Sequence, residues 1–196
     1  MSFKKLDIFE KKISDFFGSP YAISVDSCSH AIELCLRYLK VKKIKIPKNT
    51  YLSIPMTATK LNLKWAWVKN KWVDYYYLEN TNIIDAATYW KKNGYINHTF
   101  MCISFQYQKH INIGKGGMIL TDNEDAHIKL KKMSHDGRDR HQKWRDQNID
   151  TMGFHYNLTP ENAKVGLKIF KKKSNLKPKK WSYKDYPDLS KMKVFK

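Results

Sequence analysis

The sequence predicts an α/β domain. Short apolar runs with the length of buried strands recur along the chain. Stretches with apolar residues three and four positions apart, which are typical of helices, alternate with these runs. Small polar or glycine-containing turns separate the two kinds of segment, and such alternation is the pattern of α/β folds. The 196 residues, of which 42% are hydrophobic, are enough for one domain, or for one domain with a tail.

The N-terminal elements follow from apolar spacing and from turn residues. Apolar side chains three and four positions apart predict a helix over 3–17 that ends at Gly18. The apolar run 21–25 predicts a buried strand, and a tight polar turn over 26–30 leads to a helix over 31–39. A helix that starts just after a strand directs its N-terminal N–H groups at a ligand above the strand, and these groups favour phosphate.

The remaining elements are predicted in the same way. Strands are expected over 43–47, 63–68, 72–78, 82–85, 100–105 and 116–121. Helices are expected over 125–133 and 160–170, and a helix-compatible stretch ends at Leu61. Thr159 is expected to cap the last helix, because Pro160 follows it at the first helical position. Beyond Lys171 the chain is rich in lysine, proline and tryptophan, which predicts an extended tail.

The charge and the cysteines limit the class of protein. There are 37 Lys and Arg residues against 18 Asp and Glu, so the net charge is +19. This excess favours polyanions, but the joint abundance of Lys, Ile and Asn also indicates an AT-rich coding sequence. Cys28, Cys35 and Cys102 are too few and too scattered for a disulfide framework or a metal site. Without an apolar span or a visible signal peptide, we expect a cytoplasmic protein with no metal and no membrane partner.

Polar groups gather where the predicted strands end or turn into helices. In open α/β sheets, ligands bind at these positions. The segments offer hydroxyl groups, an aromatic ring, a carboxylate at the end of a buried strand and a lysine in a glycine-flanked loop. They are Ser27-Cys28-Ser29, Thr50-Tyr51, Asp85-Ala86-Ala87, and Ser104 to Lys109 followed by Gly114 to Gly117. A lysine with a lowered pKa in such a site can form a Schiff base with a carbonyl cofactor.

The order and the residues of these segments resemble the motifs of the DegT/DnrJ/EryC1/StrS family of pyridoxal-phosphate (PLP) sugar aminotransferases. Each motif is weak alone, but the matches occur in the same order as in the family. They are Ser27-Cys28-Ser29-His30-Ala31, Thr50-Tyr51-Leu52-Ser53, Ile84-Asp85-Ala86-Ala87, Ser104 to Lys109 with Gly114 to Met118, His135-Asp136-Gly137-Arg138, and Gly153 to Thr159 with Ala163, Gly166 and Leu167.

The resemblance implies a role for each candidate residue. Lys109 would form the Schiff base with PLP and move the proton, and Asp85 would pair with the pyridine nitrogen as the second catalytic residue. Tyr51 would stack on the ring. Cys28, Ser29 and Ser104 would hold the phosphate. His155 and Asn157 complete the expected cofactor-binding set, at positions where the family has residues that reach the partner subunit's phosphate and substrate.

The resemblance also implies an architecture and a reaction. The fold would be an abbreviated fold-type-I, aspartate aminotransferase-like large domain over 1–170, with a lysine-, proline- and tryptophan-rich tail over 171–196 and no small C-terminal domain. The protein would act as a homodimer with shared sites. It would transfer an amino group from glutamate or glutamine to a nucleotide-linked keto sugar. A compact enzyme of viral type in a host cytoplasm is one interpretation of the short length.

Two alternatives remain open at this point. Family members are longer than this chain, and His155 and Asn157 replace their usual Asn and Arg. A PLP-binding protein with non-transaminase or degenerate chemistry is therefore the first alternative. The second is a basic nucleic-acid-binding module, although no zinc-finger, RNA-recognition or heptad-flanked basic pattern is present.

Overall fold

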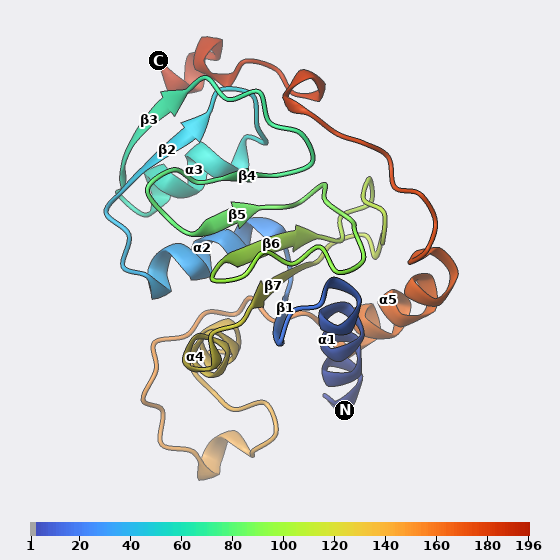
Figure 1. Cartoon of the computed structure of the whole chain (residues 1–196). Helices are drawn as coiled ribbons and strands as arrows, with labels where there is room; N and C mark the ends of the chain where they lie inside the picture. The colour runs from blue at the N-terminus through green and yellow to red at the C-terminus, as the bar shows by residue number, and fades with distance from the viewer. Residues whose placement is uncertain (1–2) are drawn as a thin grey trace.

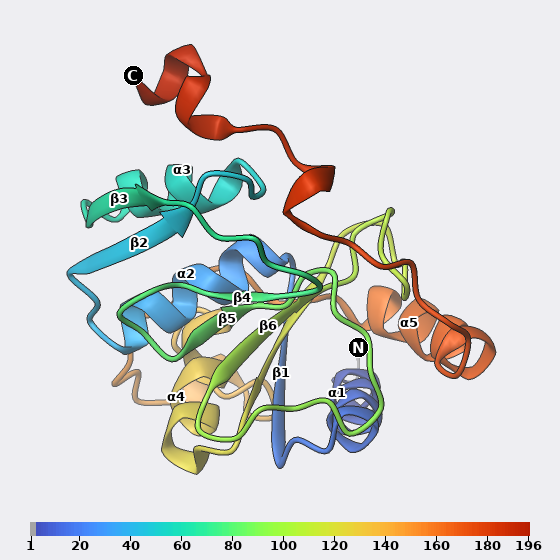
Figure 2. The ribbon, with the colours of Figure 1, turned by 45° about the horizontal axis from the view of Figure 1, so that its top comes forward.

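The computed structural model describes residues 3–196 and contains a mixed five-stranded sheet between layers of helices (Figure 1, Figure 2). The strand order is β1-β7-β6-β5-β4. β5 and β6 are parallel, whereas the other neighbouring strands are antiparallel. The strands of this sheet are β1 (Tyr21–Val25), β4 (Tyr76–Tyr77), β5 (Ile83–Asp85), β6 (Phe100–Ser104) and β7 (Gly117–Thr121).

Helices cover both faces of the sheet. α1 and α5 pack against each other on one face, and α2 and α4 do so on the other. Along β6, Met101 and Ile103 belong to the core beneath α1, while Phe100 and Cys102 belong to the core beneath α2. Successive side chains of a strand point to opposite faces, so β6 contributes to both cores. The helices are α1 (Lys4–Phe17), α2 (Cys28–Tyr38), α4 (Glu124–Ser134) and α5 (Pro160–Lys173).

A smaller unit extends the α2 side of the molecule. β2 (Lys43–Pro47) and β3 (Lys64–Val68) pair in parallel, and α3 (Ser53–Lys60) connects them. Ile44 and Ile46 of β2 are buried in the core that α2 shares, while Lys43 and Lys45, which alternate with them, are exposed. This alternation fits a half-buried strand, so the unit is fixed to the main domain through apolar packing.

The predicted α/β elements are confirmed, with differences at some bounds. Gly18 ends α1 with a φ of 76°, and the Thr159 side chain caps α5 by accepting a hydrogen bond from the Asn162 N–H. α2 begins at Cys28 rather than at residue 31. The expected polar turn is thus the first turn of the helix, because the Ser27 hydroxyl caps it by accepting a hydrogen bond from the His30 N–H.

Two other bounds were wrong. The expected strand over 72–78 is reduced to Tyr76–Tyr77, because Asp74 adopts a left-handed φ of 64° that interrupts extended backbone. α5 continues to Lys173 instead of ending at residue 170, because Lys171 to Lys173 form a basic last turn that suits the negative end of the helix dipole.

The C-terminal segment after α5 is fixed to the rest of the protein. It leaves α5 and returns across the molecule to the side of β2 and β3 (Figure 2). The Asp74 N–H donates to the Trp181 carbonyl at 2.9 Å, and the Leu189 N–H donates to the Lys48 carbonyl at 2.9 Å. The division of the chain into 1–170 and 171–196 stays a prediction. The short 3₁₀ helices of the chain are η1 (Trp144–Asp146), η2 (Tyr183–Asp185), η3 (Leu189–Lys191) and η4 (Lys193–Phe195).

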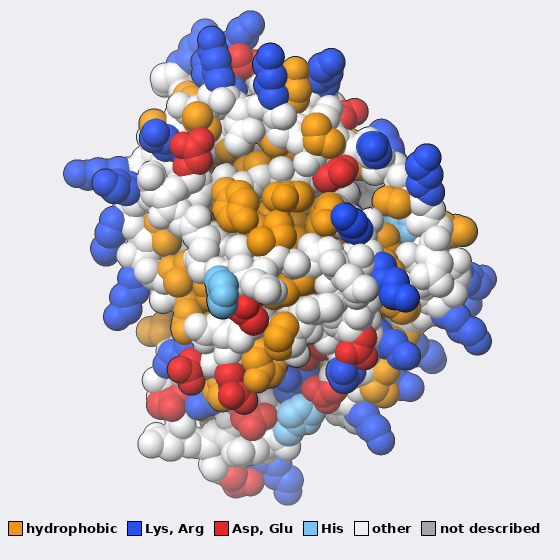
Figure 3. Space-filling view, viewed as in Figure 1, with side chains coloured by type: hydrophobic (Ala, Val, Ile, Leu, Met, Phe, Trp, Pro, Cys, Tyr) orange, Lys and Arg blue, Asp and Glu red, His pale blue; other side chains and the backbone are white. Residues whose placement is uncertain are grey.

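The surface shows no single basic stripe on the face of Figure 3. Lysine and arginine side chains lie around its edge, and hydrophobic side chains gather near its centre. A nucleic-acid backbone is usually bound along a continuous basic surface. Over residues 3–196, no helix has the length and apolar character needed to cross a bilayer. The same residues contain no group of His, Cys, Asp and Glu side chains suited to a metal ion.

Candidate active site

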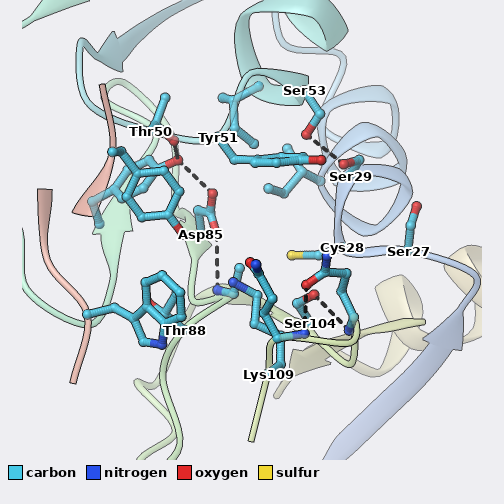
Figure 4. A pocket seen from close by; sticks show the side chains of 18 of the residues that line it. Ser27, Cys28, Ser29, Thr50, Tyr51, Ser53, Asp85, Thr88, Ser104 and Lys109 are labelled. Atoms are coloured by element: carbon cyan, nitrogen blue, oxygen red, sulfur yellow. Dashed lines mark hydrogen bonds between the residues drawn. The ribbon is translucent and has the colours of Figure 1, made fainter. Parts of the chain in front are cut away.

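A cavity of about 480 Å³ lies where the ends of β5 and β6 meet the N-terminus of α2 (Figure 4). The turn segments that the sequence places at strand ends converge on it, as expected for an α/β sheet. Most of the predicted site residues line this cavity. They are Cys28, Ser29, Tyr51, Asp85, Ser104 and Lys109.

The N-terminus of α2 forms one wall of the cavity. The Ser29 hydroxyl donates to the Ser53 hydroxyl at 2.6 Å, which joins α2 to the start of α3. The first N–H groups of a helix have no partner within the helix and carry a partial positive charge. The backbone N–H groups of Cys28 and Ser29 lie at this end, so the wall is suited to an anionic group such as phosphate.

Gly117 lets β7 approach this helix terminus. A Cβ atom at Gly117 would lie 2.4 Å from the Ser27 carbonyl carbon and 2.5 Å from the Cys28 nitrogen. Both are backbone atoms that cannot turn aside. The position of the α2 N-terminus therefore depends on the absence of a side chain at this strand position.

Gly117→Ala is expected to lower the free energy of unfolding by about 1–3 kcal/mol, the usual cost of overpacking. The measurement is urea denaturation followed by circular dichroism. Gly116→Ala is the matched control, because a Cβ there would mainly meet the flexible end of Ile113 at 2.6 Å. Equal losses in both variants would contradict this account of Gly117.

Asp85 is held by hydrogen bonds to both carboxylate oxygens. Tyr76 donates its hydroxyl proton to Oδ2 at 2.6 Å, and the Ala87 N–H donates to Oδ1 at 3.0 Å. The Thr50 hydroxyl is hydrogen-bonded to Tyr76 in turn. Since Tyr76 gives its only proton to Asp85, Thr50 is the donor in that bond. These contacts fix the direction of the carboxylate at the end of β5.

The environment of Asp85 makes its negative charge costly. Burial raises the pKa of Asp85, although the hydrogen bonds from Tyr76 and Ala87 and the charge of Lys109 act in the opposite direction. Burial and the nearby Asp85 charge raise the pKa of Tyr76 well above its usual value, which keeps Tyr76 a hydrogen-bond donor. A cationic group placed next to Asp85 would relieve the cost of its charge.

Lys109 lies near Asp85, in the turn that follows β6. Its side chain is partly buried, and this burial lowers the pKa of Lys109. Cys28 and Asp85 act to raise the pKa, and the Lys179 charge lowers it further. The Lys109 Nζ lies 4.9 Å from the centre of the Trp181 ring. A lysine in such a setting is neutral at lower pH than an exposed one and can react as a nucleophile.

The remaining residues of the cavity have simpler surroundings. Tyr51 is 56% exposed, and its ring lies across the cavity from Lys109 in Figure 4. The Ser104 hydroxyl accepts a hydrogen bond from the Gln106 N–H at 3.3 Å, so its proton remains free for a ligand. Cys28 donates its thiol proton to the Cys102 carbonyl, and burial raises its thiol pKa well above the usual value. The thiol is therefore neutral.

His155 and Asn157 lie outside the residues that line the cavity. The His155 side chain is 83% exposed, and its Nδ1 lies 3.1 Å from Asp136 Oδ2. Asn157 forms a backbone bridge with Val25. The structure thus brings neither residue to the other candidates within one chain, and their role toward a cofactor stays a prediction.

Sequence reasoning missed two contributions to the cavity. Tyr76 belongs to an aromatic-rich stretch that the apolar pattern places in the core, so its hydroxyl contact with Asp85 has no local signal. Trp181 and Tyr186 line the cavity although they belong to the C-terminal tail. The aromatic residues in a segment otherwise rich in lysine were the one available sign that the tail packs against the protein.

Comparison with known proteins gives a family match over most of the chain. A model of the DegT/DnrJ/EryC1/StrS aminotransferase family matches residues 1–86 and 84–186. An uncharacterized protein from Methanocaldococcus jannaschii is 24% identical, and the match covers 84% of this chain and 56% of that protein. The chain thus spans little more than half the length of this relative.

Solved structures share the fold. AtS13 from Actinomadura melliaura superposes with a TM-score of 0.73 at 18% identity, over 85% of this chain and 59% of that one. For the sugar aminotransferase CalS13 from Micromonospora echinospora, the TM-score is 0.71 at 13% identity, over 85% of this chain and 60% of that one. For a DegT DnrJ EryC1 StrS aminotransferase from Brucella abortus, the TM-score is 0.71 at 15% identity, over 85% of this chain and 58% of that one. The predicted fold class, an aminotransferase-type α/β fold, is confirmed, and the match covers 58–60% of the length of these structures.

Proposed function

The chain belongs to the DegT/DnrJ/EryC1/StrS aminotransferase family, and we propose that it is a PLP-dependent sugar aminotransferase. Its reaction would move an amino group from glutamate or glutamine to a keto sugar carried on a nucleotide. The observation that carries this proposal is the cavity in which Lys109, with a lowered pKa, lies near the buried carboxylate of Asp85.

The side chains around the cavity fit the chemical groups of PLP. The α2 N-terminus, with Ser29, suits the phosphate. Asp85 suits a protonated ring nitrogen, because the carboxylate is buried and, among the described residues, Lys109 is the charged group that lowers its pKa. Tyr51 offers a flat face for the ring, and Lys109 offers an amine for the aldehyde. The phosphate, the ring nitrogen, the ring face and the aldehyde of the cofactor thus each have a partner of suitable chemistry in one cavity.

When bound, PLP supplies an electron sink that stabilises negative charge at the reacting carbon of the substrate. Asp85 would keep the ring nitrogen protonated, because a neighbouring carboxylate favours the charged form. Tyr76 and the Ala87 N–H hold that carboxylate in position. Lys109, as a neutral amine, would take a proton from the substrate carbon and deliver it to the carbon that carried the aldehyde of the cofactor.

Glutamate tests the proposal directly. The protein is first saturated with PLP, and its visible absorption is then followed after addition of glutamate alone. We expect the PLP band to be lost to the absorption of the pyridoxamine form, because amino transfer stores the amino group on the cofactor. If the band forms but stays unchanged with both glutamate and glutamine, PLP binding without transamination is the better description.

The pH dependence of PLP attachment follows from the lowered pKa of Lys109. Only the neutral amine reacts with an aldehyde, so attachment is expected to reach its maximal rate below the pH required by an ordinary lysine, whose pKa is about 10.4. Lys179→Gln removes a positive neighbour and is expected to shift the inflection upward. Lys180→Gln is the matched control. Stopped-flow absorbance across pH measures both, and an inflection at the ordinary lysine value would contradict the prediction.

A homodimer is part of the proposal. Tyr51 lines the cavity and is 56% exposed, while the exposed His155 does not line the cavity of its own chain. A second copy could place His155 and Asn157 at the neighbouring site, which is where the family resemblance puts them. A cytoplasmic location is supported by three cysteines that are free of disulfides. The viral origin stays a prediction.

A further inference from the structure

The C-terminal segment forms one wall of a second, half-open chamber beside the candidate active site. This chamber has a volume of about 290 Å³, and Lys109, Ser104 and Trp181 line both it and the first cavity. Lys109 thus stands between the two spaces. The outer wall of the chamber comes from residues 173–181, which follow directly from α5.

Hydrogen bonds hold this wall in place. The Trp90 indole N–H donates to the Ser174 carbonyl at 3.0 Å, and the His110 Nε2 lies 2.7 Å from the Lys173 carbonyl oxygen. At the other end, the Trp181 carbonyl accepts from the Asp74 N–H at 2.9 Å. The segment is therefore anchored on both sides of the chamber, and side chains between the anchors line the chamber together with Lys109.

The chamber is strongly cationic. The described residues that line it include no carboxylate, and none of the ion pairs among residues 3–196 involves Lys173, Lys177 or Lys179. The positively charged or basic residues that line the chamber are Lys109, His110, Lys173, Lys177 and Lys179. Positive charge gathered around a recess without a counter-charge attracts anions.

Trp181 brings two of these cations together. The Lys179 Nζ lies 3.9 Å from the centre of its ring and the Lys109 Nζ lies 4.9 Å from it. An indole ring stabilises a neighbouring ammonium group through its electron-rich face. When Lys109 is protonated, the two like charges repel each other, and Lys179 accordingly contributes to the lowered pKa of Lys109. An anion in the chamber would relieve this repulsion.

We propose that the chamber formed by residues 173–181 binds an oxyanion of the substrate, with Lys177 and Lys179 as its main ligands. This inference rests on the proposed function. The anion is distinct from the cofactor phosphate, which is assigned to the α2 N-terminus on the other side of Lys109. A carboxylate of the amino donor and the diphosphate of a nucleotide sugar share this chemistry, and lysine binds either as a point charge.

Calorimetric titration with two probes tests the inference and separates the two sources. Inorganic pyrophosphate represents the diphosphate, and glutarate represents the amino donor. Both are titrated at constant ionic strength into the apo-protein and into PLP-saturated protein, whose cofactor fills the first anion site. We compare wild type, Lys177→Gln/Lys179→Gln and the control Lys180→Gln/Lys184→Gln. The control removes the same charge from exposed residues of the same segment that do not line the chamber.

We expect Lys177→Gln/Lys179→Gln to weaken binding of at least one probe about tenfold, and the control to change it less than about threefold. Stronger binding of pyrophosphate or of glutarate identifies the source of the anion. The inference is overturned if neither probe binds saturably to wild type, or if both double variants lose the same affinity. PLP uptake by the same proteins is scored separately by absorbance, so failure of the proposed function is distinguished from failure of the chamber.

Discussion

Lys109→Ala is expected to abolish stable PLP attachment. It is also expected to lower kcat by about 10²–10⁴-fold, the range for loss of a positioned acid–base group. The variant should still fold, because Lys109 lies in a turn and makes no side-chain ion pair among the described residues. Its amine carries two roles in the proposal, which are the covalent hold on the cofactor and the proton transfer at the substrate carbon.

Lys115→Ala is the informative comparison for Lys109. Lys115 also lines the cavity, but its Nζ lies 3.3 Å from Asp26 Oδ2. We expect the Lys115 variant to retain a covalently reducible cofactor, whereas the Lys109 variant should not. Activity is measured as amino transfer from glutamate with purified, PLP-supplemented protein. If Lys109→Ala kept the activity of the wild type, the assignment of the amine would be wrong.

Asp85→Asn is expected to lower kcat by about 10²–10³-fold, the range for loss of one preorganised charge at a reacting centre. PLP should still bind, because the phosphate and Lys109 contacts remain. The neutral amide no longer favours the protonated ring nitrogen, so the cofactor becomes a weaker electron sink. Tyr76→Phe keeps the charge of Asp85 and removes one hydrogen bond that positions it, so its expected loss of kcat is smaller.

Stability provides an independent measurement on Asp85. The folded-state pKa of Asp85 is raised, so above this pKa ionisation of the carboxylate costs the folded apo-protein free energy. The Asp85→Asn apo-protein should therefore be at least as stable as wild type at pH 7, although it is less active. Urea denaturation of both apo-proteins checks this. A large loss of stability would indicate that Asp85 is a structural residue.

Much of the fold could be predicted because its signals are local. Periodic apolar residues define α1, α4 and α5, and short apolar runs define β1, β2, β6 and β7. Short apolar runs likewise predict that Asp85 and Ser104 lie at the ends of two strands, and these strands, β5 and β6, are parallel neighbours. This arrangement brings residues that are far apart in the sequence to one edge, and it explains why Lys109 and Asp85 could be assigned to one cavity.

The rest depends on contacts that no local pattern encodes. β4 has two residues, and its Tyr76 reaches Asp85 because the antiparallel pairing of β4 with β5 places the two residues opposite each other. The composition of the C-terminal segment predicts an extended tail, yet backbone hydrogen bonds to Lys48 and to Asp74 hold this segment across the site. His155 remains undecided for the same reason, since its predicted partner lies on another chain.

The most direct test of the central claim is borohydride reduction of the PLP-treated protein, followed by peptide mass mapping. The account predicts a visible absorption band on addition of PLP, loss of that band on reduction, and one phosphopyridoxyl group fixed on the peptide that contains Lys109. The absence of any band with excess PLP would contradict the account. Fixation spread over the many other lysines of this +19 chain, with Lys109 not preferred, would contradict it equally.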